Sequence, residues 1–194
     1  MKIGIYSGSF NPVHLGHIAL ADYLVAHGVV DEVWLIRSPQ NPFKQTDRLL
    51  SDEHRAEMLR LAVEGHRGLK ICTIEDNLPK PNYTINTLTA LRQLDSTDEF
   101  HMIIGADNWE VFDKWRDWEI IVRDFHLIVY PRPGYAYPTV DHSQYPNVMV
   151  VDAPQFDYSS TAIRAKCRRG EPVDDMVAPN VLDYIINNEL YTNE

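Results

Sequence analysis

Residues 2–17 constrain the fold of this chain most strongly, because they join a short apolar strand to a helix through a turn of small residues. Residues 2–6 are mostly apolar and run into a Ser-Gly-Ser turn at residues 7–9, which predicts a strand that ends sharply. After Pro12, apolar side chains return at helical spacing, so a helix is expected over about residues 13–27. A strand, a tight turn and a helix in this order indicate an α/β protein.

The junction between this strand and this helix has the features of an anion site. Backbone N–H groups at a helix start have no partner within the helix, and the helix dipole favours negative charge there. Gly8 allows the backbone to approach a ligand closely. His14 and His17 are three residues apart, so they are expected to project from one face of the first helical turns and to donate hydrogen bonds to phosphate oxygens. One histidine near a helix start is more commonly solvated or capping, and the phosphate interpretation depends on the whole run G-S-F-N-P-V-H-L-G-H.

Strands and helices continue to alternate along the rest of the chain. Strands are expected at residues 31–38, 69–74, 100–104, 125–130 and 148–151, and helices at 51–64, 83–94, after 107, after 159 and at 179–190. This order predicts an α/β fold with a doubly wound parallel sheet of Rossmann-like topology. A length of 194 residues suits one domain over residues 1–194, of which the helical segment at about 158–190 is a part.

Composition narrows the class of protein. A net charge of −10 argues against a general nucleic-acid binder, so an anionic substrate must be met by local cations and helix ends. No apolar stretch is long enough to span a membrane, and no leader is recognised before the first strand. The two cysteines, Cys72 and Cys167, form no CxxC pair. We therefore expect a cytoplasmic protein with no membrane or nucleic-acid partner.

A second candidate phosphate site lies at residues 157–164. Ser159, Ser160 and Thr161 precede a helix and provide caps and free N–H groups, which is an everyday capping pattern when it stands alone. Arg164 follows Ser160 by four residues and therefore returns to the same helix face, where its guanidinium could grip a phosphate with two hydrogen bonds.

Together the two motifs resemble those of the nucleotidylyltransferase superfamily, whose members join a nucleotide monophosphate unit to a phosphate acceptor and release pyrophosphate. H-L-G-H at residues 14–17 is similar to the (H/T)xGH signature, and Y-S-S-T-A-I-R at residues 158–164 is similar to I-S-S-T-x-(I/V)-R, with Tyr158 in place of an aliphatic residue.

Three further segments resemble the nicotinate mononucleotide adenylyltransferases of that superfamily. N-Y-T-I-N-T-L at residues 82–88 is similar to S-Y-T-x-D-T-L, with Asn82 and Asn86 as departures, and G-A-D-N-W-E-V-F-D-K-W at residues 105–115 is similar to G-A-D-x4-(F/L)-x2-W. R-P-G at residues 132–134 resembles the R-P-G segment of the same family, whose arginine lies near the nucleotide. Read from the residues alone, Thr84 and Asp107 could each simply cap a helix.

The resemblance implies that ATP and nicotinate mononucleotide give deamido-NAD and pyrophosphate by direct in-line attack, without a covalent intermediate. It implies that His14 and His17 bind the α- and β-phosphates, that Arg164 and Lys44 of the proline-bounded loop hold the leaving phosphates, and that Mg²⁺ is carried by substrate phosphates and water, with no metal ligand from the protein. Read alone, Lys44 could equally be a surface lysine. The implied catalytic residues are His14, His17, Lys44 and Arg164. The implied ATP-binding residues are Gly8, Ser9, Phe10, His14, His17, Gly105, Asp107, Arg132, Ser159, Ser160, Thr161 and Arg164. The implied pyridine-nucleotide-binding residues are Ser7, Lys44, Tyr83, Thr84, Thr87 and Trp115.

Two alternatives stay open at this point. One is a transferase of the same superfamily that acts on nicotinamide mononucleotide, phosphopantetheine or a cytidylyl acceptor. The segments at residues 83–88 and 105–115 argue against the last two acceptors, but they discriminate only weakly between the acid and the amide of the mononucleotide. The other is a nucleotide-binding module without activity, since fold does not imply function. The sequence leaves open self-association into a homo-oligomer, the degree of acid-over-amide preference, any loop motion, and the role of residues 135–147.

Overall fold

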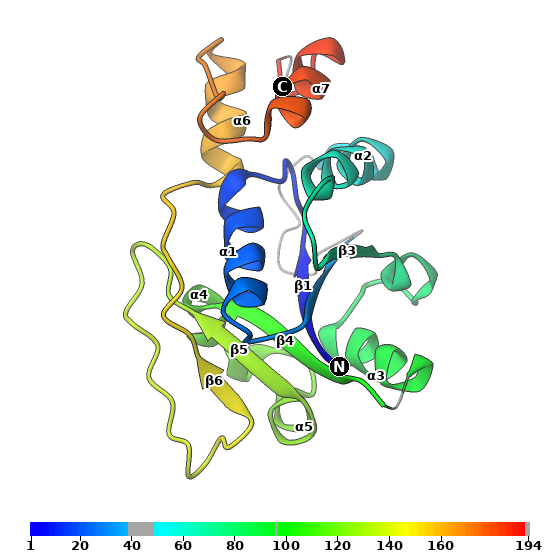
Figure 1. Ribbon diagram of the computed structural model, residues 1–194, viewed down its shortest axis with the longest axis vertical. Helices are drawn as coiled ribbons and strands as arrows, with labels where there is room; N and C mark the ends of the chain where they lie inside the picture. The colour runs from blue at the N-terminus through cyan, green and yellow to red at the C-terminus, as the bar shows by residue number, and fades with distance from the viewer. Residues whose placement is uncertain (39–48, 96, 193–194) are drawn as a thin grey trace.

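A computed structural model describes residues 1–38, 49–95 and 97–192. Its centre is a six-stranded sheet in the order β3-β2-β1-β4-β5-β6, in which every neighbouring pair is parallel (Figure 1). The strands are β1 (Lys2–Gly8), β2 (Glu32–Arg37), β3 (Leu69–Cys72), β4 (Glu99–Gly105), β5 (His126–Tyr130) and β6 (Val148–Val150). The prediction of a doubly wound, Rossmann-like parallel sheet is confirmed.

Helices cover both faces of this sheet. They are α1 (Leu15–Ala26), α2 (Asp52–Val63), α3 (Thr84–Leu94), α4 (Ala106–Trp109), α5 (Trp118–Asp124), α6 (Ser160–Arg168) and α7 (Pro179–Asn187), with 3-10 turns η1 (Ile74–Asn77) and η2 (Phe112–Lys114). In Figure 1, α6 and α7 lie together beyond the end of the sheet at which β1 finishes.

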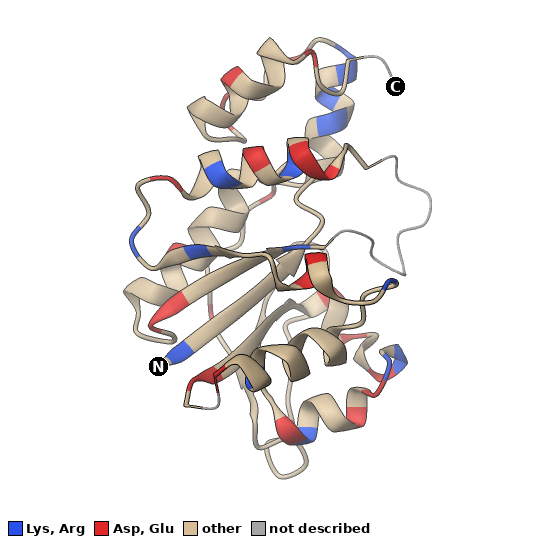
Figure 2. Ribbon diagram, turned by 90° about the vertical axis from the view of Figure 1, so that its right-hand side faces the viewer, with Lys and Arg blue, Asp and Glu red and all other residues tan. Residues whose placement is uncertain are grey.

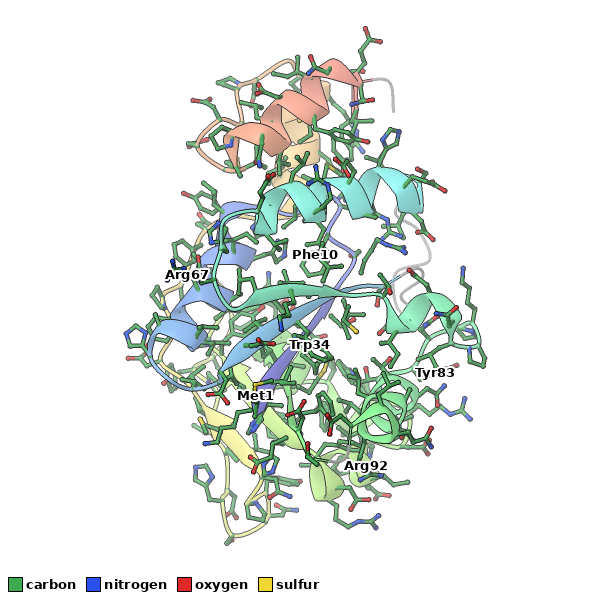
Figure 3. All side chains as sticks on the ribbon, turned by 45° about the vertical axis from the view of Figure 1, so that its right-hand side comes forward. Met1, Phe10, Trp34, Arg67, Tyr83 and Arg92 are labelled. Atoms are coloured by element: carbon green, nitrogen blue, oxygen red, sulfur yellow. The ribbon has the colours of Figure 1, made fainter. Side chains whose placement is uncertain are left out.

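Alternating side chains of the central strands supply two cores. Phe100, Met102 and Ile104 of β4 pack with residues of α3 and α5, whereas Ile103 between them packs with α1 and α2. This period of two follows from the pleat of a strand, and burial on both faces explains why the strands read as nearly continuous apolar runs. Figure 3 labels Phe10 in the second of these cores, between α2 and the sheet.

The direction of winding reverses between β1 and β4. From β1 the chain moves outward to β2 and β3, then returns to pair β4 against the other side of β1 and continues to β5 and β6. In open parallel sheets the crevice for a ligand lies at this point, outside the carboxyl ends of the strands.

Local boundaries differ from expectation by two or more residues at several places. β1 continues two residues further than expected, and α7 ends three residues earlier than expected. α1 begins at Leu15, two residues later than expected, and His14 is its N-cap, with extended backbone (φ −139°, ψ 168°). β3 ends at Cys72, two residues earlier than expected, and η1 occupies the start of the segment expected to be a loop, where it buries Glu75. Within the described ranges no helix combines the length and the apolar character needed to cross a membrane.

Candidate active site

A cavity of about 600 Å³ lies at the carboxyl ends of β1 and β4. Predicted site residues line it from several elements: Ser7, Gly8, Ser9, Phe10, His14, His17, Tyr83, Thr84, Gly105, Asp107, Trp115, Arg132, Ser159, Ser160, Thr161 and Arg164. Two predicted residues are not among them. Lys44 lies outside the described residues, and Thr87 lies behind the wall, buried, with its hydroxyl directed at Glu75.

His14 and His17 lie face to face at the start of α1, with ring centroids 3.6 Å apart. The backbone N–H of His14 donates to His17 Nδ1 (3.2 Å), so the proton of a neutral His17 is on Nε2, where it can be donated to a ligand. A Cβ at Gly16 would come within 3.2 Å of His14 Nδ1, which explains the need for glycine between the two histidines. The expectation that both side chains project from the helix itself is corrected, since His14 is the cap residue before the first turn.

Burial governs the charge of His14. Its side chain is 8% exposed, and burial together with the nearby Arg132 guanidinium lowers the pKa of His14 to about 4. His14 is therefore neutral at pH 7, which lets one imidazole approach the positively charged Arg132 without repulsion.

The turn before α1 is held tightly. Phe10 adopts a left-handed backbone conformation (φ 44°), which non-glycine residues rarely adopt and which persists only where the surrounding structure holds it. Its buried ring packs edge-on against Tyr6 and His17, with centroids 5.9 and 5.1 Å away. A Cβ at Gly8 would come within 3.2 Å of the Phe10 ring. The compact aromatic packing thus fixes the backbone of the first motif.

The second motif is joined directly to the first. Ser159 is the N-cap of α6 and accepts a hydrogen bond from the N–H of Ala162 (3.1 Å). Ser160 Oγ donates to the carbonyl of Pro12 (2.8 Å), and Arg164 Nη1 donates to the carbonyl of Asn11 (2.8 Å). Arg164 is 6% exposed, so it both lines the cavity and supports the turn of the first motif.

Asp107 and Arg132 form an ion pair on the β4–β5 side of the cavity (3.3 Å). Asp107 lies inside α4, whose N-cap is Gly105, so the capping explanation for this aspartate is not the observed one. A Cβ at Gly105 would overlap Arg132 Cδ and Asp107 Oδ1, and the close approach of the pair therefore requires glycine there. Beside this pair, Tyr6 and Tyr130 share a hydrogen bond between their hydroxyls (3.2 Å).

Tyr83 and Trp115 form the opposite side of the cavity. Tyr83 is the N-cap of α3 and lies at the start of that helix in Figure 3. The Arg116 guanidinium lies 4.7 Å from the centre of its ring, a cation–π contact that orients the ring. Within the described chain no side chain caps the N-terminus of α3, so its first N–H groups and its dipole remain available to an anion in the cavity.

A second, smaller cavity of about 40 Å³ adjoins the first and shares with it the side chains of His14, His17, Tyr130 and Arg132. Phe156 and Tyr158, whose rings stack at 6.1 Å, contribute to its wall. The wall of this small cavity is therefore partly aromatic.

Sequence reasoning missed two buried charged residues close to the wall. Arg55 of α2 is 1% exposed, and its guanidinium donates to the carbonyls of Ser9 (2.8 Å), Ser38 (2.9 Å) and Leu50 (3.2 Å). Glu75 of η1 is 4% exposed. Both stand among charged neighbours in the sequence and look like surface residues, so no sequence pattern distinguishes them.

Positive charge is supplied locally. Figure 2 shows acidic and basic residues together on α2, whereas the charged residues of α6 are all basic, namely Arg164, Lys166 and Arg168. With a net charge of −10, the chain can therefore meet a phosphate group only where such side chains and helix ends are placed.

Comparison with known proteins gives matches over nearly the whole chain. The family model described as cytidylyltransferase-like matches residues 5–166. A relative from Bacteroides fragilis, curated as "Probable nicotinate-nucleotide adenylyltransferase", is 47% identical over 95% of this chain and 91% of its own length. A relative of the same description from Flavobacterium johnsoniae is 37% identical over 98% of this chain and 99% of its own length.

Solved structures show the same fold. The structure titled "Plasmodium falciparum nicotinic acid mononucleotide adenylyltransferase complexed with NaAD" superposes with a TM-score of 0.81 at 21% identity, covering 100% of this chain and 98% of that one. A second structure of the Plasmodium enzyme, complexed with APC, gives a TM-score of 0.80 with the same identity and coverage.

Proposed function

The chain belongs to the cytidylyltransferase-like family and, within it, to the nicotinate-nucleotide adenylyltransferases, and on that basis we propose that it transfers the adenylyl group of ATP to nicotinate mononucleotide, giving deamido-NAD and pyrophosphate. One structural observation carries the proposal. The two phosphate-binding motifs, which are about 150 residues apart in the sequence, line one cavity at the switch point of the sheet and are hydrogen-bonded to each other through Ser160 and Arg164.

The chemistry requires positioning and charge neutralisation more than a protein base. An oxygen of the mononucleotide phosphate attacks the α-phosphorus of ATP in line, a new P–O bond forms, and the bond to the β-phosphate oxygen breaks to release pyrophosphate. The attacking phosphate is already ionised at pH 7, so no group has to remove a proton from it.

Each motif has a part in this scheme. His17 donates from Nε2 to a phosphate oxygen, and neutral His14 lies against it. Arg164, Lys44 and the hydroxyls of residues 159–161 hold the triphosphate as negative charge moves to the leaving group.

The two sides of the cavity suit the two substrates. Asp107 can accept hydrogen bonds from the ribose hydroxyls of ATP, and the aromatic rings of Phe156 and Tyr158 beside the smaller cavity can pack against the adenine ring. Tyr83 and Trp115 suit the pyridine ring, and the uncapped N-terminus of α3 favours a carboxylate on that ring.

We expect Mg²⁺ to enter with the triphosphate. The described residues contain no cluster of three carboxylate, imidazole or thiol groups arranged for a metal, and Asp107 brings a carboxylate to the wall. This donor set fits an ion held mainly by phosphate oxygens and water, which would neutralise phosphate charge. A cytoplasmic location is part of the proposal, supported by the use of ATP and by the free thiols of Cys72 and Cys167.

Pyrophosphate release tests the proposal. We expect the purified protein to release pyrophosphate from ATP with nicotinate mononucleotide, and to do so about tenfold more efficiently than with nicotinamide mononucleotide, because the end of the α3 dipole favours the acid. Equal efficiency would contradict this selection of the acid. If neither mononucleotide leads to release of pyrophosphate, the proposed reaction is contradicted, and a transferase for phosphopantetheine or a cytidylyl acceptor, or a binding module without activity, is favoured. Assays with those acceptors and with CTP would distinguish these alternatives.

A further inference from the structure

A buried carboxylate lies directly behind one wall of the cavity. Glu75 Oε1 accepts hydrogen bonds from Thr87 Oγ1 (2.9 Å) and Ser7 Oγ (3.4 Å), and Glu75 Oε2 accepts one from Ser38 Oγ (3.0 Å). Ser7 and Ser38 line the cavity, at the carboxyl ends of β1 and β2, whereas Glu75 and Thr87 do not. The carboxylate of Glu75 is therefore connected to the cavity through the hydroxyl groups of the two serines.

The backbone around Glu75 is fixed as well. Asn82 Nδ2 donates to the carbonyl of Glu75 (3.0 Å), which ties η1 to the residue before Tyr83. Burial raises the pKa of Glu75, while the hydrogen bonds from Thr87, Ser38 and Ser7 act in the opposite direction by stabilising the carboxylate. A buried carboxylate is costly unless donors surround it, and here the donors are hydroxyl groups.

The carboxylate of Glu75 determines the direction of the hydroxyl protons of Ser7 and Ser38. An ionised carboxylate can only accept, and each hydroxyl has a single proton. The Ser38 proton is taken by Glu75 Oε2. The Ser7 proton goes either to Glu75 Oε1 or to Ser38 Oγ (3.2 Å), and both lie on the protein side of the wall. The oxygens of both serines are thus left with lone pairs for a ligand in the cavity.

We propose that Glu75 is a positioning residue that turns the hydroxyl protons of Ser7 and Ser38 away from the cavity, so that their oxygens accept hydrogen bonds from the ribose hydroxyls of the mononucleotide. The inference rests on the proposed function for the identity of the substrate. Phosphate and carboxylate groups ionised at neutral pH cannot donate, whereas ribose hydroxyls can. The serines share the wall with Asn82 and Tyr83, on the side assigned to the mononucleotide, and Asp107 of α4 serves the other nucleotide.

The test measures whether Glu75 and a ribose hydroxyl are coupled. Calorimetry at pH 8 gives the affinity of the protein for nicotinate mononucleotide and for its 2′-deoxy and 3′-deoxy analogues. We expect the wild-type protein to bind one analogue about five- to tenfold more weakly than the parent, the usual effect of one hydrogen bond. In Glu75→Gln, whose amide N–H₂ can donate to Ser38 Oγ and turn the serine proton outward, that ratio falls below about twofold. The exposed Glu119 of α5 gives the matched control, and Glu119→Gln keeps the wild-type ratio.

A merely structural role for Glu75 would weaken the parent and the analogues equally, and an unchanged ratio in Glu75→Gln would overturn the proposal. Ser38→Ala and Ser7→Ala each remove one acceptor and keep the Glu75 side chain, which loses one donor in each variant and retains the hydrogen bond from Thr87. They decide the question if Glu75→Gln does not fold. A wild-type ratio in both serine variants would equally overturn the proposal.

Steady-state kinetics gives a second readout: we expect KM for the mononucleotide to rise in Glu75→Gln while KM for ATP changes by less than about twofold. Because calorimetry needs no turnover, a protein that binds mononucleotide but releases no pyrophosphate would contradict the proposed function and still report on Glu75.

Discussion

At the scale of single residues, the stacked pair His14 and His17 shows how backbone geometry sets a proton's position. The backbone N–H of His14, the N-cap residue, donates a hydrogen bond to Nδ1 of His17. The proton of the neutral His17 ring is therefore on Nε2, which faces outward, and this backbone group orients the ring in the way that a carboxylate often does at other sites. The spacing of the two histidines was visible in the sequence. Their stacking was not, because it depends on the extended backbone of His14, and histidine is not among the preferred N-cap residues.

Removing the outward donor is expected to slow the reaction. We predict that His17→Ala lowers kcat by about a hundredfold or more, the effect of losing one preorganised donor to developing charge. Single-turnover pyrophosphate release measures this, and thermal unfolding verifies that the variant is folded. His27→Ala, at the exposed C-terminal end of α1, serves as the control and is expected to retain activity. Wild-type turnover in His17→Ala would contradict the assigned role.

Other site residues show where sequence reasoning stops. The predicted residues that line the cavity come from short motifs whose spacing fixes them on one turn or helix start. Thr87 belongs to such a motif, yet it faces a buried glutamate that the motif does not reveal. The roles of all these residues, including Lys44 outside the described chain, stay predictions until variants are measured.

At the scale of elements, α2 positions the turn of the first motif through Arg55. Its guanidinium joins three carbonyls: Ser9 after β1, Ser38 after β2, and Leu50 before α2. It also forms an ion pair with Asp52 one turn earlier. The guanidinium of Arg55 therefore ties together three loop segments: the one after β1, the one after β2 and the one before α2.

Replacing Arg55 should destabilise the fold strongly. We predict that Arg55→Met lowers the free energy of unfolding by about 3 kcal/mol, because the carbonyls of Ser9, Ser38 and Leu50 lose their donor, while Asp52 keeps its ion pair with Arg37. Arg60→Met on the same helix is the matched control. Arg60 is largely exposed and pairs with Glu57 at the surface, so a loss of less than about 1 kcal/mol is expected. Urea unfolding compares the two variants, and equal losses would show that Arg55 contributes no more than a surface residue.

Element boundaries were predictable where a strong signal exists. Ser51 and Pro179 mark the starts of α2 and α7 as expected from capping preferences. The 3-10 turn η1 follows an apolar strand with no break in composition, and its course is set by the burial of Glu75 among hydroxyls from β1, β2 and α3. Contacts between distant elements leave no local pattern in the chain.

At the scale of the whole molecule, buried histidines make stability depend on pH. Burial lowers the pKa of His14 to about 4, and burial followed by the neighbouring His126 lowers that of His101. A histidine whose pKa is lower in the folded than in the unfolded protein binds its proton more readily when unfolded. Its contribution to stability is therefore complete above the unfolded pKa of 6.5 and is lost as the pH falls from 6.5 towards 4.

We predict that the wild-type free energy of unfolding falls by about 3 kcal/mol more than that of His14→Gln between pH 7 and pH 4, because burial lowers the pKa of His14 from 6.5 to about 4. Urea titrations at several pH values measure the difference. His101 is present in both proteins, so its contribution cancels. Parallel curves for the two proteins would contradict the low pKa of His14.

The overall topology was the most predictable property of the molecule. Alternation of strands and helices specifies a parallel sheet, and right-handed crossovers leave few orders for its strands. The distribution of buried charge was not predictable, because Arg55 and Glu75 are buried by partners 12 to 68 residues away as well as by near neighbours.

The link between the two ends of the chain has a consequence for biosynthesis. The turn at Asn11 is made among the first residues, but Ser160 and Arg164 bind it from α6, and the buried hydroxyl of Tyr191 donates to Asn11 Oδ1 (2.9 Å). A ribosome delivers these partners long after it has made the turn. A nascent chain that stops short of α6 can therefore form strands and helices without an assembled nucleotide site, and synthesis must pass residue 191 before the molecule can begin to compete for ATP.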